Sequence, residues 1–138
     1  MWFKFAPNPS GGIRIANLPN GKDGWVNPEI SDDKILGTSI MFLHGENAFT
    51  SLEKLFSTLG HELVHVSQIL ALTGLSASET IDKENFKNAM EHYAYMYSSF
   101  LGGGSAHFNV DWSKISPENR AKINFTNYLW TYLYNKPF

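Results

Sequence analysis

The sequence predicts a single α+β domain over residues 1–138, with a short N-terminal β-sheet followed by three helices. Short β-prone segments separated by turns occupy the first 45 residues, whereas apolar residues recur at helical spacing after residue 50. The predicted helices also carry start or stop signals. A chain of 138 residues, of which 43% are hydrophobic and 17% charged, is long enough to bury one core.

Two strands are expected before the helices. Residues 7–34 are rich in turn-forming residues, but Ile13 and Ile15 alternate with polar neighbours and predict a short strand within a hairpin or meander. Residues 35–43 are β-branched and apolar, which predicts a partly buried strand. His44 then begins a turn.

The first helix is expected at about residues 51–73. Thr50 and Glu53 fit a capping box, in which two side chains satisfy free backbone N–H groups at the helix start, and Gly74 is a natural stop. Its apolar residues recur at helical spacing: Leu52, Leu55, Phe56, Leu59, Leu63, Val66 and Leu70.

Two more helices are expected after the first. The second is predicted from residue 82 or 83 to residue 101, where three glycines end it. The third is predicted to begin with Ser116 as its N-cap and Pro117 at its first helical position, and to run to about residue 135. Residues 106–112, between these helices, are a candidate short strand.

The composition excludes several classes of protein. A net charge of −2 argues against a nucleic-acid surface, which needs clustered Lys and Arg. The absence of cysteine excludes disulfides, Cys-ligated zinc and a thiol nucleophile. No apolar run is long enough for a membrane span, and no signal peptide is recognisable at the start, so the compartment is left open between cytoplasm and secretion.

The segment HELVH, from His61 to His65, carries the main functional signal. Residues four apart lie on one face of a helix, so both imidazoles can reach one ion, with Glu62 beside them. This arrangement is typical of two zinc ligands and a carboxylate that acts on zinc-bound water. From Leu63 onward the helix is apolar nearly all round, which predicts burial and a histidine face lining a cleft. The alternative is a pair of histidines spaced four apart by chance.

A third metal ligand is needed, because catalytic zinc usually takes three protein ligands and one water. The candidates are Glu79, Glu84, Glu91, His92, His107 and Asp111. Glu91 is favoured because it lies near the middle of the second helix, where a rigid scaffold can fix a ligand. Periodicity does not choose between Glu91 and His92, which flank the apolar stripe of that helix. The stripe consists of Phe86, Met90, Tyr93, Tyr97 and Phe100.

HELVH on one helix, followed by the Glu of EHYAY on the next, resembles the gluzincin branch of zinc metallopeptidases. The extension HELVHVSQ, with Gln68, and the Glu-x-x-Ala-Tyr pattern at 91–95 resemble short bacterial versions, found as minimal peptidases and as modules of polymorphic toxins. The resemblance covers about residues 36–101. Gluzincins often carry an Asp four residues after the ligand Glu, whereas this chain has Tyr95 there.

The resemblance implies a zincin-like fold in which His61, His65 and Glu91 hold Zn²⁺ and Glu62 takes a proton from bound water. Candidate donors to the oxyanion of a reacting carbonyl are Tyr93, Tyr95, His92 and His107. In zincins an edge strand also pairs with the substrate backbone, and the candidate is Ser39 to Leu43, including Met41.

Three functions are compatible with these features. The first is a small zinc-dependent peptidase acting on a peptide or protein, either within a larger chain or opposed by an inhibitor or immunity partner. The second is a zincin-like module that binds a metal or a protein without cutting it. The third is a structural helical domain with an accidental motif.

Overall fold

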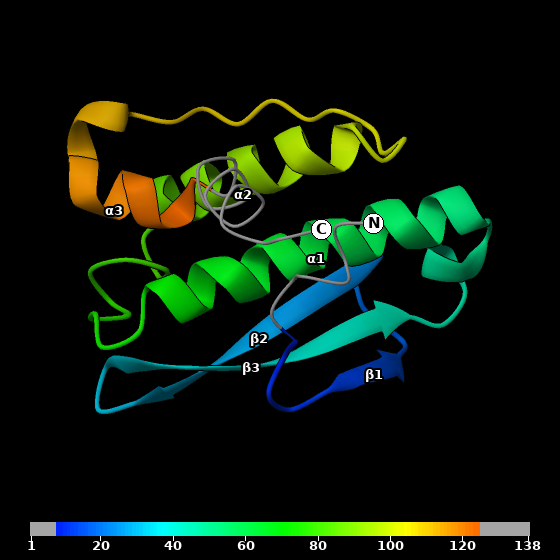
Figure 1. Cartoon of the computed structure of the whole chain (residues 1–138), viewed down its shortest axis with the longest axis horizontal. Coiled ribbons are helices and arrows are strands. Elements are labelled where there is room, and N and C mark those ends of the chain that lie inside the picture. Colours follow the sequence, from blue (N-terminus) through cyan, green and yellow to red (C-terminus); the bar gives the residue numbers. More distant parts are fainter. Residues whose placement is uncertain (1–7, 125–138) are drawn as a thin grey trace, which may run out of the picture.

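A three-stranded sheet precedes three α-helices, which confirms the predicted α+β class (Figure 1). The computed structural model describes residues 8–124. Its elements in chain order are β1 (Ile13–Ala16), β2 (Gly24–Ser31), β3 (Lys34–His44), the 3₁₀ turn η2 (Asn47–Phe49), α1 (Leu52–Ala71), α2 (Glu84–Ser99), the 3₁₀ turn η3 (Trp112–Lys114) and α3 (Pro117–Ile123). No helix among the described residues is long and apolar enough to cross a membrane.

The sheet has the order β1-β3-β2, with β3 in the centre. Strands β2 and β3 form an antiparallel hairpin, whereas β1 pairs with the other side of β3 in parallel. The hairpin turns at Asp32 and Asp33, which both have positive φ, as the tight turns that join twisted strands require. The strand at Ile13 and Ile15 was expected within a hairpin or meander; it forms, as β1, but pairs in parallel with β3. Strand β2 was not expected, because Asn27 and Pro28 give its sequence the character of a turn.

The central position of β3 corrects one functional prediction. Ser39, Met41 and Leu43 are all buried, and the backbone there is paired on both sides, with the Ser39 carbonyl accepting from the Gly11 N–H. Met41, for example, faces Ile13 on one side and Val26 on the other. The prediction that residues 39–43 pair with a substrate is therefore wrong, since no backbone edge is left free there. Within residues 8–124, the unpaired edge beside the helices belongs to β2, which lines the cleft with α1 and α2.

Met41 is expected to act through packing alone. Its side chain is 0% exposed under α1, so Met41→Ala leaves a cavity and should lower the free energy of unfolding by about 2–5 kcal/mol. Urea denaturation measures this change. A loss below about 0.5 kcal/mol would contradict the assignment of Met41 to the core.

Helix α1 lies between the sheet and α2, which explains its burial on nearly all sides (Figure 1). It is capped by Ser51, whose hydroxyl accepts a hydrogen bond from the Lys54 N–H at 3.0 Å. The predicted cap, Thr50, is wrong by one residue, because its hydroxyl donates instead to the Asn47 carbonyl. The ends of the predicted apolar stripe also lie outside the core, since Leu52 is 72% exposed.

Helices α2 and α3 cover α1 from the side opposite the sheet (Figure 1). Helix α3 begins as predicted, with Ser116 as N-cap and Pro117 first. It ends at Ile123, with Asn124 as its C-cap, so the prediction of one helix running to about residue 135 is wrong at this point; residues 125–135 lie outside the described residues. The predicted strand at 106–112 is wrong, because that segment runs over α2 without a ladder. Asn85 holds it there through two hydrogen bonds to the Asp111 backbone.

Candidate metal centre

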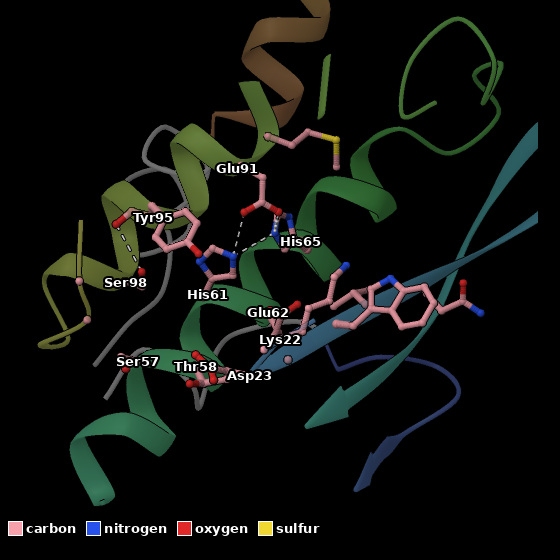
Figure 2. A pocket seen from close by; sticks show the side chains of 18 of the residues that line it. Lys22, Asp23, Ser57, Thr58, His61, Glu62, His65, Glu91, Tyr95 and Ser98 are labelled. Atoms are coloured by element: carbon pink, nitrogen blue, oxygen red, sulfur yellow. Dashed lines mark hydrogen bonds and ion pairs between the residues drawn. The ribbon is translucent and has the colours of Figure 1, made fainter. Parts of the chain in front are cut away.

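A cleft of about 1180 Å³ opens between α1, α2 and β2. Its walls carry all four residues that the motif and its proposed third ligand require: His61, Glu62, His65 and Glu91 (Figure 2). The first three project from α1, within the five residues 61–65, and Glu91 reaches across from α2. Packing of α2 on α1 therefore brings the four side chains together.

The two imidazoles and the Glu91 carboxylate converge on one point. The Nε2 atoms of His61 and His65 lie 3.2 Å apart, as expected for residues one helical turn apart. Glu91 places Oε2 3.2 Å from His61 Nε2 and Oε1 2.8 Å from His65 Nε2. Among residues 8–124, this is the one group of three such side chains whose ligand atoms all lie within 4.8 Å of one another.

This donor set fits a metal ion. Two imidazole nitrogens and one carboxylate are a ligand set that catalytic zinc takes, with a fourth position left open. The histidine side chains are only 12% exposed and Glu91 is 34% exposed, so the site is sheltered but reachable from the cleft. The trio could therefore hold a divalent ion.

Without an ion, the Glu91 carboxylate pairs with the two imidazoles. Burial by itself lowers the pKa of His65, but the hydrogen bond and charge of Glu91 outweigh this and raise that pKa to about 9. Burial raises the pKa of Glu91, yet its contacts with His61 and His65 hold it far below its ordinary value. Metal binding must therefore displace a proton from this pair.

Glu62 lies beside the trio and is almost completely buried, at 5% exposed. Burial raises the pKa of its carboxyl group, while the charges of His65 and His61 oppose that rise. Its carboxylate packs against Gly24, the first residue of β2: a Cβ at Gly24 would lie 2.8 Å from Glu62 Cγ and 3.0 Å from Oε1. A side chain at position 24 would thus push the carboxylate out of place.

Of the four candidate oxyanion donors, only Tyr95 lines the cleft. Its ring stands edge-on to His61, with centroids 4.4 Å apart (Figure 2). Burial, together with the charges of Glu91 and Glu62, raises the pKa of Tyr95, so its hydroxyl keeps its proton and can donate a hydrogen bond.

The other three candidate donors lie elsewhere. The Tyr93 hydroxyl accepts a hydrogen bond from Arg120 at 3.0 Å, and the rings of Tyr93 and His92 pack against Trp112. His107 is exposed in the segment after α2. The prediction is therefore wrong for Tyr93 and His107, as for His92, because none of them borders the cleft.

The alternative third ligands are also distant from the histidine pair. Glu79 pairs with Lys83 on the surface, and Asp111 caps η3 by accepting from Ser113. Neither these residues nor Glu84 borders the cleft. Glu91 is thus the candidate that the fold brings to His61 and His65.

Several cleft residues carry no signal in the sequence. The segment Asn20–Gly24 lines the cleft, and its Asp23 forms an ion pair with Lys54 at 2.6 Å that joins the start of β2 to α1. These contacts connect residues more than 30 positions apart, so neither periodicity nor motif spacing predicts them.

Comparisons of the chain with protein-family models, with curated proteins and with solved structures find no match.

Proposed function

We propose that the protein is a zinc-dependent peptidase in which His61, His65 and Glu91 hold the ion. The observation that carries the proposal is the convergence of two imidazole nitrogens and a carboxylate in a cleft, with Glu62 buried beside them. A zinc ion bound there would lower the pKa of a water molecule toward 7 and polarise a carbonyl group.

Glu62 would act as the general base and then as the general acid. Its carboxylate accepts a proton from water as the oxygen attacks the peptide carbonyl, and it later gives that proton to the leaving amine. The buried position supports this role, because it raises the pKa of Glu62 toward the operating pH, where proton transfer is most effective. The Tyr95 hydroxyl is the candidate donor to the developing oxyanion.

The free edge of β2 supports an extended peptide as the substrate. The His44 N–H donates to the Asp23 carbonyl at 2.8 Å, so the backbone groups of Asp23 face β3. Along an antiparallel strand, successive residues turn their backbone N–H and C=O groups alternately toward the partner strand and away from it. The N–H and C=O groups of Gly24 and Val26 therefore point away from β3, where an added strand can pair with them. Pro28, which has no N–H, ends this series of donors.

A structural ion-pair cluster is the competing interpretation, because Glu91 and the imidazoles can satisfy one another without an ion. It is weaker for one reason. A purely structural cluster has no need of a second carboxylate, Glu62, buried beside Glu91 at a cost in desolvation. A larger chain around this domain and an inhibitor or immunity partner stay predictions.

The test is cleavage by the purified protein loaded with zinc. A peptide library is incubated with the protein, and new termini are identified by mass spectrometry. Cleavage that stops on adding a chelator and returns on adding zinc is expected. A protein that binds zinc but yields no new termini would leave only the non-cutting metal-binding module.

Gly24→Ala is expected to lower peptide turnover by about 10²-fold while leaving zinc bound, because the added methyl group displaces the Glu62 carboxylate. The matched control is Gly104→Ala in the same cleft, since a Cβ there meets nothing within 4 Å. Steady-state kinetics and zinc content are measured for both. Equal turnover in the two variants would show that the position of Glu62 does not depend on Gly24.

A further inference from the structure

Gln68 lies where α1, α2 and α3 meet and is 1% exposed. Its side chain makes three hydrogen bonds. Nε2 donates to the Met90 carbonyl on α2 at 3.1 Å and to the Ile123 carbonyl at the end of α3 at 3.0 Å, and Oε1 lies 2.8 Å from His65 Nδ1. We infer that Gln68 is a positioning residue for the metal centre, and that it makes the docking of α3 part of that centre.

The surroundings of Gln68 determine which way its amide faces. Two carbonyl oxygens can only accept hydrogen bonds, so they require the NH₂ group. The amide oxygen must then face His65, and His65 Nδ1 must carry a proton to donate to it. In the neutral ring this leaves the lone pair on Nε2, the atom that faces His61 and Glu91.

The same amide also fixes the second helix. Met90 directly precedes Glu91, so a hydrogen bond to its carbonyl holds the backbone that carries the third ligand. One side chain of α1 thus sets the ring of His65, the backbone beside Glu91 and the end of α3. Loss of such a partner typically weakens metal binding by 10–100-fold.

The inference rests on the metal site of the proposed function and not on peptide cleavage. It is tested with Gln68→Met, which keeps the length of the side chain but removes both donor and acceptor. Zinc affinity, measured by competition with a chromogenic chelator, is expected to fall about 10–100-fold. The control is Ser67→Ala, a buried neighbour whose hydroxyl donates to the Leu63 carbonyl within α1, and its zinc affinity is expected to stay at the wild-type value.

Two further measurements separate positioning from general loosening of the fold. The ¹⁵N NMR signal of His65 Nδ1 is expected to change in Gln68→Met and not in Ser67→Ala. Hydrogen exchange of the α3 amides is expected to slow on zinc binding in the wild type, and much less in Gln68→Met. If Gln68→Met does not fold, Gln68→Glu replaces it. That variant keeps an acceptor for His65 but loses the donors to Met90 and Ile123, so the zinc-dependent protection of α3 should be lost.

The outcomes distinguish this inference from the proposed function. Wild-type zinc affinity and an unchanged His65 signal in Gln68→Met would overturn the inference alone, as would unchanged zinc-dependent protection of α3 in Gln68→Glu. Zinc binding that depends on Gln68, in a protein that cleaves nothing, supports the inference and removes the peptidase proposal. A wild-type protein that binds no zinc overturns both.

Discussion

Replacing Glu62 with glutamine is expected to lower kcat/KM for peptide hydrolysis by about 10²–10⁴-fold while zinc stays bound. Glutamine has nearly the same shape, so it fits against Gly24 as glutamate does. It cannot accept a proton from water, and the step assigned to Glu62 is lost. Parallel measurements of turnover and of bound zinc separate lost chemistry from a lost metal.

The stability of the Glu62→Gln variant provides the first control. Burial raises the pKa of Glu62 above its ordinary value of 4.5. At pH values above 4.5, the folded protein therefore holds a proton at this site more often than the unfolded chain does. The contribution of Glu62 to the free energy of unfolding therefore falls as the pH rises. The metal-free variant should unfold at the same or higher urea concentration than the wild type at pH 7, and the difference should vanish near pH 4.

A surface substitution provides the second control. Glu79→Gln removes an exposed carboxylate that pairs with Lys83 on the surface, so turnover should not change. If Glu62→Gln and the wild type cleave the same peptides at the same rate, Glu62 is not the base. The peptidase proposal would then lose its mechanism.

Local patterns in the sequence were sufficient for the parts of the site that lie on one helix. Helical spacing puts His61 and His65 on one face, and the apolar sequence from Leu63 onward requires cover on both sides. The structure supplies that cover with the sheet below α1 and α2 above it. The α+β order followed from the same local signals.

Contacts between distant segments could not be predicted in the same way. Strand β3 has the composition of a buried strand, but whether it lies at an edge or in the centre depends on its partners. One of those partners, β2, is hidden by Pro28, which is tolerated there because its missing N–H faces the free edge. Periodicity likewise left Glu91 and His92 equivalent, and only the packing of α2 separates them.

Replacing Glu91 with alanine is expected to weaken zinc binding by at least about 100-fold. Removing a residue that only hydrogen-bonds to a metal ligand already costs up to about 100-fold, and Glu91 is proposed as a ligand itself. The expected thermal signature follows from mass action. Zinc at 100 times its Kd adds about 2.7 kcal/mol to wild-type stability, or roughly 10 °C in Tm, and Glu91→Ala should lose nearly all of this shift. Glu84→Ala, on the exposed first turn of α2, is the control and should keep it.

The metal-free form of the Glu91→Ala variant tests the ion-pair interpretation at the same time. Burial lowers the pKa of His65, but its partners, Glu91 foremost, raise it from 6.5 to about 9, so this contribution to stability is present below pH 6.5 and is lost as the pH rises through 9. The lowered pKa of Glu91 contributes above 4.5 and is lost as the pH falls. Urea unfolding without metal should therefore show the variant destabilised between about pH 5 and 9 and little changed above that range. A structural cluster predicts this pH window and no response of the wild type to zinc, whereas a metal centre predicts both the window and the zinc-dependent rise in Tm.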